Sequence, residues 1–365
     1  MCPSKKGAKK KAGPSKKAQT VSRKKEHVEI CLTKKVEASY NYWDDIHIVH
    51  NAIPELDKDE IDTSVQVFGK KLRAPIIIAA MTGGYPEARK INENLARAAA
   101  EMGLGLGVGS QRSALESREH VHTFEVVKDY DVPLVLANLG APQAKDAKVE
   151  IGRRAMEMLD ADLLCIHLNF TQEVVQPEGN TDAKGVLAGI ARWAKELPIV
   201  AKETGAGMSS EVVRALAGAG VKGIDVGGLG GTSWSAVEVH RARKKGIKRL
   251  EELGYTFWDW GIPTPVSVVE AARGAPGLPI IATGGVRDGL DVARSLVLGA
   301  SCAGIARPLL APAVKGFDEL MGALGTLVSG LKAAMFLVGA GNIEALRHKR
   351  RVMTGPTVKW LEQLR

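Results

Sequence analysis

The 365-residue sequence contains little cysteine, few aromatic residues and no long uninterrupted apolar run. Its four cysteines are widely separated and form no CxxC pair, which excludes a clustered zinc site or a disulfide framework and favours a reducing compartment. The most apolar stretch, residues 322–341, is broken by Lys332 and predicts a buried or amphipathic helix rather than a membrane span. The N-terminus lacks the apolar segment of a secretory signal. We therefore expect a cytoplasmic protein with no membrane partner.

Acidic residues are absent from residues 1–25, which hold ten basic residues. Because the chain has 50 basic and 41 acidic residues, residues 26–365 have 40 and 41, a net charge of −1. A nucleic-acid-binding domain carries its basic residues on a folded face, so no nucleic-acid partner is expected. Residues 1–22 are mostly Lys, Ala, Gly, Ser and Pro, which predicts a disordered basic tail. Residues 23–365 are expected to form one domain.

Short apolar runs, followed by turn residues and amphipathic helical stretches, recur from residue 74 onward. Continuous apolar runs are typical of strands buried on both faces of a parallel sheet. The eight runs are residues 74–81, 104–110, 132–140, 161–169, 197–205, 223–231, 278–286 and 302–310. Eight β/α units predict the α/β class and a (β/α)8 TIM barrel. A doubly wound open sheet is the competing architecture.

Two segments do not fit the simple repeat. The long gap between the sixth and seventh runs exceeds one loop and one helix, which predicts an active-site insertion between strands 6 and 7. Residues 26–73 precede the barrel and are expected to cover one of its ends. Helix starts are expected at Pro86, at Ser209 or Ser210, and at Asp288, because Pro favours the first turn and Ser and Asp cap helices.

The carboxyl ends of barrel strands carry the chemistry of such enzymes, and here they end in glycine and polar residues. GGTSW and TGGVRDG place backbone N–H groups at helix starts, where phosphate binds. Arg287 either adds a bidentate phosphate contact or is a solvated helix-start arginine. Lys202, in an apolar frame, needs an anion or ligand. It either forms a Schiff base, contacts a bound ring or forms a salt bridge, for which Glu203 is the candidate partner.

His167 and Asn169 point to the same side of one strand and precede Gln172 and Glu173. A lone carboxylate is too little for a protein metal cage. It suits Mg2+, which keeps waters and takes phosphate oxygens. Glu173 is therefore either a magnesium ligand or a surface-loop acid.

These residues lie in motifs that occur in a fixed order from about Arg23 to about residue 348. They are SRKKEHVEIC, DDIHIVHNAIPE, MTGG, GSQR, HLNFTQE with QPEGN, KETGAG, GGTSW and TGGVRDGLDVA. The ordered set resembles the type 2, flavin-dependent isopentenyl-diphosphate isomerases. The resemblance implies a barrel that converts isopentenyl diphosphate into dimethylallyl diphosphate with Mg2+ and reduced FMN as the acid–base cofactor. It also implies NAD(P)H as reductant and a homotetramer or homo-octamer.

The resemblance also implies roles for individual residues. The flavin contacts are Met81, Thr82, Gly83, Ser110, Asn138, Lys202, Thr232, Gly285, Arg287, Ala306 and Arg307. The substrate contacts are Arg23, Lys24, Ser110, Gln111, Arg112, His167, Asn169 and Gln172. Gln172, His167 and Lys202 are the expected catalytic residues, and Glu173 is the expected metal ligand. Two positions depart from the family pattern: Asn180 stands where an acid is expected, and Arg307 where many members have an aliphatic residue.

Three other functions compete with this one. A hydroxy-acid oxidase of the FMN barrel type needs a histidine base at a late strand end, but between His167 and His348 only His240 occurs. A nucleotide-reducing barrel needs a cysteine after strand 6, and GGLGGTSW has none. A binding module would use the basic tail on nucleic acid, and its affinity would depend strongly on salt.

Overall fold

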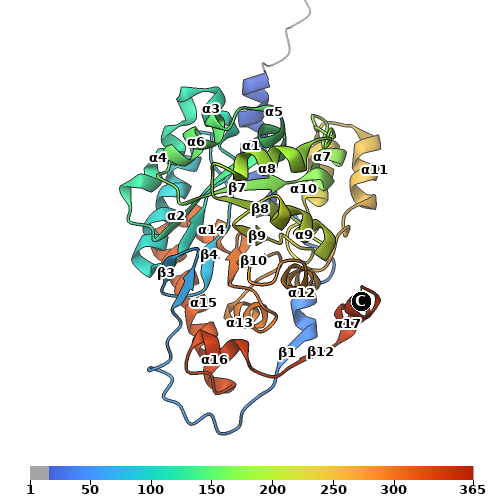
Figure 1. The fold of residues 1–365 in the computed structure, drawn as a ribbon. Coiled ribbons are helices and arrows are strands. Elements are labelled where there is room, and N and C mark those ends of the chain that lie inside the picture. Colours follow the sequence, from blue (N-terminus) through green and yellow to red (C-terminus); the bar gives the residue numbers. More distant parts are fainter. Residues whose placement is uncertain (1–15, 365) are drawn as a thin grey trace, which may run out of the picture.

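The computed structural model describes residues 16–364, with side chains from residue 22 onward. Eight parallel strands close into a barrel in the order β10-β11-β4-β5-β6-β7-β8-β9 (Figure 1). The strands are β4 (Ile76–Ile78), β5 (Gly105–Gly107), β6 (Leu134–Gly140), β7 (Leu163–Leu168), β8 (Ile199–Glu203), β9 (Gly223–Asp225), β10 (Ile280–Thr283) and β11 (Cys302–Ile305). Each lies inside one of the eight predicted apolar runs, so the predicted TIM barrel is confirmed.

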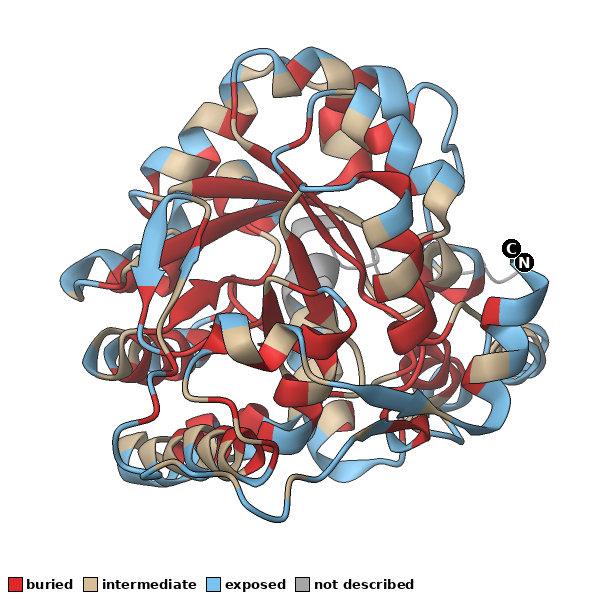
Figure 2. Ribbon diagram, turned by 60° about the horizontal axis from the view of Figure 1, so that its bottom comes forward, coloured by how far each residue is buried: buried red, intermediate tan, exposed pale blue. Residues whose placement is uncertain are grey.

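Helices surround the barrel and cover its strands, which are buried in Figure 2. Ser209 accepts the N–H of Val212 and Asp288 accepts that of Asp291, so two helices begin where capping residues predicted them. These outer helices are α2 (Ala88–Met102), α3 (Arg112–Glu116), α4 (His122–Glu125), α5 (Ala141–Asp146), α6 (Glu150–Glu157), α7 (Phe170–Val175), α8 (Val186–Ala194), α9 (Ser210–Gly218), α13 (Gly289–Val297), α14 (Arg307–Lys315) and α15 (Phe317–Leu337), with the short 3-10 helices η2 (Arg118–His120) and η3 (Val126–Asp129).

The predicted insertion between the sixth and seventh strands consists of helices. The segment contains α10 (Trp234–Lys244), α11 (Lys248–Thr256) and α12 (Thr264–Gly274). Helix α12 packs against β10 and α9 as a regular barrel helix does, whereas α10 and α11 pack on each other and on α7. The additional structure is therefore the α10–α11 pair, placed at the carboxyl ends of the strands.

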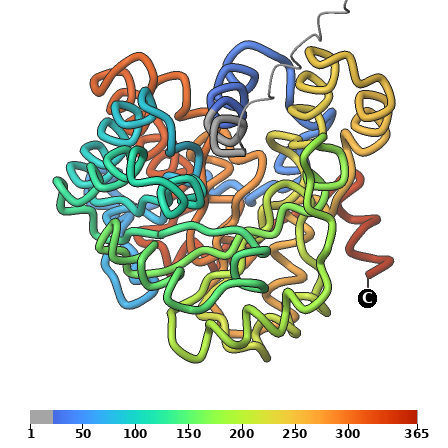
Figure 3. Tube along the Cα trace, turned by 90° about the horizontal axis from the view of Figure 1, so that it is seen from above, coloured from blue at the N-terminus to red at the C-terminus, as the bar shows by residue number. Residues whose placement is uncertain are grey.

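The N-terminal extension covers both ends of the barrel. Strands β2 (Val65–Val67) and β3 (Lys70–Leu72) pair as a hairpin, whose Val67 and Leu72 pack against barrel-interior side chains. Helix α1 (Lys16–Thr33) contacts α3, α10 and α14, which follow three different strands. It therefore lies across the carboxyl end, as the view from above shows (Figure 3). The extension was predicted to cover one end of the barrel, and in the structure it covers both ends.

Most of the predicted tail, residues 1–22, lies outside the described residues. Residues 16–22, however, are the first turns of α1, so the boundary at residue 22 is corrected. The physical reason is local: residues 16–33 contain no Gly or Pro and include good helix formers such as Lys, Ala and Gln.

The N-terminal extension and the C-terminal segment pair on one side of the barrel. Strand β1 (Ile46–Ile48) pairs with β12 (Arg351–Met353), and the buried Asp45 carboxylate accepts the N–H of Thr357 at 3.0 Å. This contact fastens the C-terminal helix to the N-terminal extension. The remaining elements are η1 (Tyr42–Asp45), α16 (Ile343–Arg347) and α17 (Gly355–Gln363).

Among the described residues, one helix, α15, is long and apolar enough to cross a membrane by length and composition. It packs against α13, α14 and α2, and 33% of its most apolar 18-residue window is buried. The prediction of a helix around residues 322–341 is therefore confirmed.

Candidate functional site

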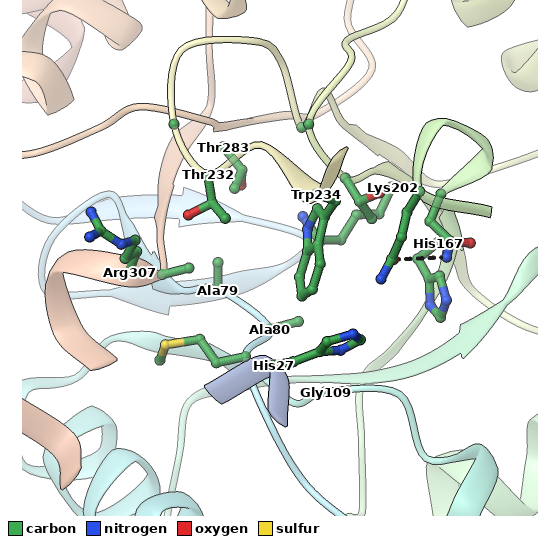
Figure 4. Close-up of a pocket in the computed structure, with 18 of the residues that line it drawn as sticks. His27, Ala79, Ala80, Gly109, His167, Lys202, Thr232, Trp234, Thr283 and Arg307 are labelled. Carbon is green, nitrogen blue, oxygen red and sulfur yellow. Dashed lines mark hydrogen bonds between the residues drawn. The ribbon is translucent and has the colours of Figure 1, made fainter. Parts of the chain in front are cut away.

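A cavity of about 590 Å3 opens at the carboxyl ends of the barrel strands, a volume typical of small-molecule sites. Figure 4 shows side chains from several strand ends converging on it. The predicted site residues that line it are Arg23, Lys24, Met81, Ser110, Arg112, Asn138, His167, Asn169, Gln172, Glu173, Lys202, Thr232, Gly285, Arg287, Ala306 and Arg307.

Three predicted site residues do not line the cavity. Gln111 is fully buried, where its amide donates to the Ala155 carbonyl and its oxygen accepts the Asn138 N–H. It fixes the end of β6 instead of facing a ligand. Thr82 and Gly83 are buried as well. The residues of that strand end that face the cavity are Ala79, Ala80 and Met81.

Strand register explains one cluster in the cavity. His167, Lys202 and Asp225 are register partners on β7, β8 and β9, so their side chains lie side by side. The Lys202 Nζ lies 2.7 Å from the Asp225 carboxylate, and both side chains are buried. Lys202 therefore forms a salt bridge, one of its predicted alternatives, but its partner is Asp225 and not Glu203.

Glu203 does not pair with Lys202. Its carboxylate accepts the backbone N–H groups of Gly205 and Ala206 at 2.6 and 2.5 Å, which closes the loop after β8. Burial raises the pKa of Glu203 to about 7, against the opposing effect of these N–H groups. The residue stabilises the loop outside the cavity.

His167 is held as a neutral imidazole. Burial, together with the nearby charge of Lys202, lowers its pKa to about 4. Its Nδ1 lies 2.7 Å from the Asn138 amide oxygen. Because that oxygen only accepts, Nδ1 carries the proton and Nε2 is left as an acceptor.

We expect His167 to make the protein less stable as the pH falls from 6.5 to 4. In this window the unfolded chain binds a proton that the folded chain excludes, because the folded pKa is about 4 and the ordinary value 6.5. The free energy of unfolding should fall by about 2 kcal/mol, less than the full shift because the ring faces a cavity open to water. Urea unfolding of wild type and His167→Asn across this range measures it. The variant should lose this slope, and an exposed control, His122→Asn, should keep it; equal slopes in all three would contradict the assignment.

A buried carboxylate on α10 organises a second cluster. Glu238 is fully buried, accepts the Gln172 amide at 2.9 Å and the Arg241 guanidinium at 2.6 Å, and lies 3.0 Å from His27 Nε2. Burial opposes its ionisation, but His27, Arg241 and Gln172 outweigh burial and lower the pKa of Glu238 to about 2. Burial also lowers the pKa of His27, so the neutral ring donates to Glu238. The imidazole meets the Trp234 ring edge-on, with centroids 5.2 Å apart (Figure 4).

Of this cluster, only Gln172 was predicted from the sequence as a site residue. His27 and Trp234 line the cavity and lie within the motifs SRKKEHVEIC and GGTSW, so a signal for them existed. Glu238 lies in α10, most of whose residues are buried, and has no local signal.

Basic residues gather where α1 meets the end of β5. The Lys24 ammonium donates to the carbonyls of Gly83 and Ser110 at 2.7 and 2.5 Å. Burial and the neighbouring Arg23 lower the pKa of Lys24 to about 7. Arg112, half-exposed, pairs with Glu116 at 2.8 Å. The arrangement provides a cationic rim suited to an anionic ligand.

Hydrogen-bond donors surround the Glu173 carboxylate. It accepts the Asn169 and Gln176 amides at 2.9 and 2.5 Å and the Asn180 backbone N–H at 2.6 Å. Since the contact uses the backbone of Asn180, the departure at that position does not remove it. In the part of the chain that the structure describes, no three His, Cys, Asp or Glu side chains gather as a metal site. The Glu173 carboxylate alone fits Mg2+ only where waters and ligand oxygens complete the coordination.

Glycine lines the opposite end of the cavity, at the ends of β9 and β10. A Cβ on Gly231 would lie 2.5 Å from the backbone nitrogen of Gly285, and Gly285 itself has φ +71°. Only glycine leaves this backbone open to a ligand. A cradle of uncovered amides fits the phosphate of FMN.

The two arginines at this end are already paired. The Arg287 guanidinium bonds to Asp44 at 2.6 Å and to the buried Asp291 at 2.8 Å. In this structure, the side chain predicted to make a bidentate phosphate contact or to be solvated is instead paired with two carboxylates. Arg307 lies 2.5 Å from Glu37 and donates to the Cys31 carbonyl, which ties the end of α1 to the start of α14.

A closed eight-stranded barrel with its cavity at the carboxyl ends of the strands defines the class of (β/α)8 enzymes. The chain matches the family described as FMN-dependent dehydrogenase over residues 29–156 and 117–353. Its fold resembles that of mandelate oxidase solved with an FMN adduct (TM-score 0.59, 17% identity, 94% of each chain covered). A mandelate oxidase structure with (S)-2-phenylpropionate is similar (TM-score 0.60, 16% identity, 92% and 98% covered).

Curated relatives are far more similar in sequence. The isopentenyl-diphosphate delta-isomerase of Methanothrix thermoacetophila is 48% identical, with 94% of this chain and 96% of the relative covered. The isomerase of Archaeoglobus fulgidus is 46% identical, with 94% and 99% covered. The chain belongs to the FMN-dependent, type 2 family of isopentenyl-diphosphate delta-isomerases.

Proposed function

We propose that the protein isomerises isopentenyl diphosphate to dimethylallyl diphosphate, using reduced FMN and Mg2+, with NAD(P)H as reductant. One observation carries the proposal: a single cavity joins two anion-binding ends. The glycine cradle at β9 and β10 suits the cofactor phosphate. The basic rim of Arg23, Lys24 and Arg112 suits a diphosphate.

The reaction needs a proton delivered to C4 and another removed from C2, with no net redox change. Reduced FMN, when bound, supplies the acid and base for both transfers. The chain contributes position and charge: Lys202, backed by Asp225, places a cation in the cavity floor that favours an anionic ring. Gln172, held by Glu238, presents a fixed amide. Neutral His167 adds an acceptor without adding charge.

Water must be kept from a carbocation-like transition state. Helix α1 lies over the cavity and supplies His27, and α10 supplies Trp234, so two additional elements close the open end of the barrel. At the basic rim, Glu173 would hold Mg2+ together with the diphosphate oxygens. The free energy of binding the diphosphate, which does not react, then helps to hold the reacting carbons in position.

A hydroxy-acid oxidase activity is less well supported. Among the described residues, the histidines that line the cavity are His27 on α1 and His167 on β7, and neither lies at a late strand end. His240 instead bonds to the Lys35 carbonyl. The oxidases share the fold at 15–18% identity, whereas the isomerases reach 42–48%. Steady consumption of O2 with a hydroxy acid would support the oxidase.

The proposal is tested with the purified protein. It should be yellow, and reduction with dithionite should bleach it. It should isomerise isopentenyl diphosphate only when the flavin is reduced and Mg2+ is present. A colourless, flavin-free preparation that turns over the substrate would overturn the proposal. Size-exclusion chromatography with light scattering tests the homotetramer or homo-octamer that the resemblance implies, and cell fractionation tests the cytoplasmic location.

We expect Glu173→Gln to raise the Mg2+ concentration needed for half-maximal activity by at least about tenfold, because the amide removes the carboxylate proposed to ligate Mg2+ beside the diphosphate. Activity measured over a Mg2+ titration gives this value. Glu119→Gln, exposed and outside the cavity, is the matched control and should leave it unchanged. An unaltered Mg2+ requirement in Glu173→Gln would remove the metal role of this residue.

A further inference from the structure

The loop after β10 is held from outside the barrel by the N-terminal extension. The indole of the fully buried Trp43 donates to the Gly284 carbonyl at 2.9 Å. The Asn41 amide donates to the Gly285 carbonyl at 2.7 Å, while its oxygen accepts the Trp43 N–H at 3.1 Å. Two successive carbonyls of a glycine loop are therefore fixed by a segment more than 240 residues earlier in the chain.

Holding a carbonyl also sets the direction of the N–H in the same peptide plane. The described residues contain no cis peptide bond, and in a trans peptide the C=O and N–H point in opposite directions. Trp43 and Asn41 therefore turn the N–H groups of Gly285 and Val286 away from themselves. Neither N–H has a hydrogen-bond partner among the described residues, and both residues line the cavity.

The surroundings leave these two N–H groups to a ligand. Gly231 has no side chain to cover the Gly285 nitrogen, which a Cβ there would approach to 2.5 Å. The same N-terminal segment also engages Arg287 through Asp44, at 2.6 Å. Because the Arg287 guanidinium is already paired with Asp44, the donors left for an anion at this end of the cavity are the backbone N–H groups.

We propose that Asn41 and Trp43 are positioning residues that aim the Gly285 and Val286 N–H groups at the phosphate of FMN. The inference rests on the proposed use of FMN. It assigns the specificity for FMN over unphosphorylated riboflavin to contacts made by the N-terminal extension, whose Asn41 also lines the cavity. Loss of either contact frees the loop carbonyls to turn, so the phosphate loses its aligned donors while the ring keeps its surroundings.

Flavin binding to two variants tests this. Asn41→Ala removes one carbonyl contact, and Trp43→Phe removes the other while keeping an aromatic ring in the core. Flavin-free full-length protein is titrated with FMN and with riboflavin, and binding is followed by flavin fluorescence. We expect FMN to bind about tenfold more weakly, or worse, in each variant, and riboflavin binding to change by less than about twofold. Asn51→Ala, in the same extension but outside the cavity wall, is the matched control and should change neither.

Two results would overturn the inference: equal weakening of FMN and riboflavin, which indicates a general structural role, or unchanged FMN binding. Trp43→Phe keeps the comparison available where Asn41→Ala fails to fold. A wild-type protein that binds both flavins equally well would instead contradict the phosphate site itself. Failure of the proposed cofactor is thereby distinguished from failure of the positioning role.

Discussion

Replacing Glu238 with alanine is expected to reduce turnover at least about hundredfold and to lower the free energy of unfolding by about 3–5 kcal/mol. The carboxylate is fully buried and joins Gln172, His27 and Arg241. Without it, the amide of Gln172 and the ring of His27 lose their acceptor in a buried setting. Both side chains line the cavity, so their displacement disturbs the reacting end of the site.

Glu238→Gln separates charge from shape. It keeps an acceptor for the neighbouring amide but removes the charge that Arg241 pairs with, so we expect a smaller loss of turnover and a comparable loss of stability. The matched control is Glu251→Ala, which breaks a half-exposed pair with Arg243 on the adjacent helix and should cost less than about 1 kcal/mol. Turnover, KM and urea unfolding are measured for all three. Wild-type turnover in the alanine variant would show that Gln172 needs no anchor.

The pH dependence of this cluster follows from the lowered pKa of Glu238. A carboxylate with a pKa of about 2 in the folded protein contributes stability that is complete above its ordinary value of 4.5 and is lost as the pH falls toward 2. His27, whose pKa is also lowered, acts in the same sense below its ordinary value of 6.5: the unfolded ring takes up a proton there first, so stability falls as the pH falls.

The barrel was predictable because its signal is local. Each strand is a run of apolar residues buried on both faces, and the caps Ser209 and Asp288 act within one helical turn. The hairpin of β2 and β3 and the pairing of β1 with β12 were not predicted. These strands have three residues each and mix exposed with buried side chains, so no run of apolar residues in the sequence indicates a strand there.

Which strand ends meet at the cavity was also predictable, but which way each side chain points was not. Gln111 follows Ser110 directly, yet Ser110 lines the cavity while Gln111 is turned into the protein interior. Arg287 has the chemistry of a phosphate ligand, but Asp44, 243 residues earlier, occupies it. The sequence shows which hydrogen-bond donors a side chain has, but it does not show which distant residue accepts those hydrogen bonds.

The site residues that were not predicted at all also depend on partners far away in the sequence. Glu238 contacts His27, which is 211 residues away in the sequence, and Gln172, which is 66 residues away. Contacts between residues so far apart in the sequence produce no recognisable motif. Asp225 is different, because a carboxylate inside the apolar run GIDVGG is itself unusual. Its position next to Lys202 follows from the strand register, in which Val200 pairs with Gly223 and Lys202 with Asp225.

Replacing Lys202 with methionine is expected to lower the free energy of unfolding by about 3–5 kcal/mol, because the buried Asp225 then carries an uncompensated charge. Flavin binding should weaken as well, since the cavity floor loses its cation. Urea unfolding measures the first effect, and titration of the flavin-free protein with FMN measures the second. Lys222→Met, an exposed lysine just before β9, is the matched control and should change neither.

Adding Asp225→Asn to Lys202→Met separates the two effects. The double variant buries two neutral groups, so most of the lost stability should return, because the cost arises from the unpaired carboxylate. FMN binding and turnover should stay impaired, since the amide does not restore a cation. Recovery of flavin binding along with stability would show that Lys202 acts on the cofactor only by keeping the barrel folded. A double variant as unstable as Lys202→Met would instead place the energetic role of Lys202 in its packing and not in its pairing with Asp225.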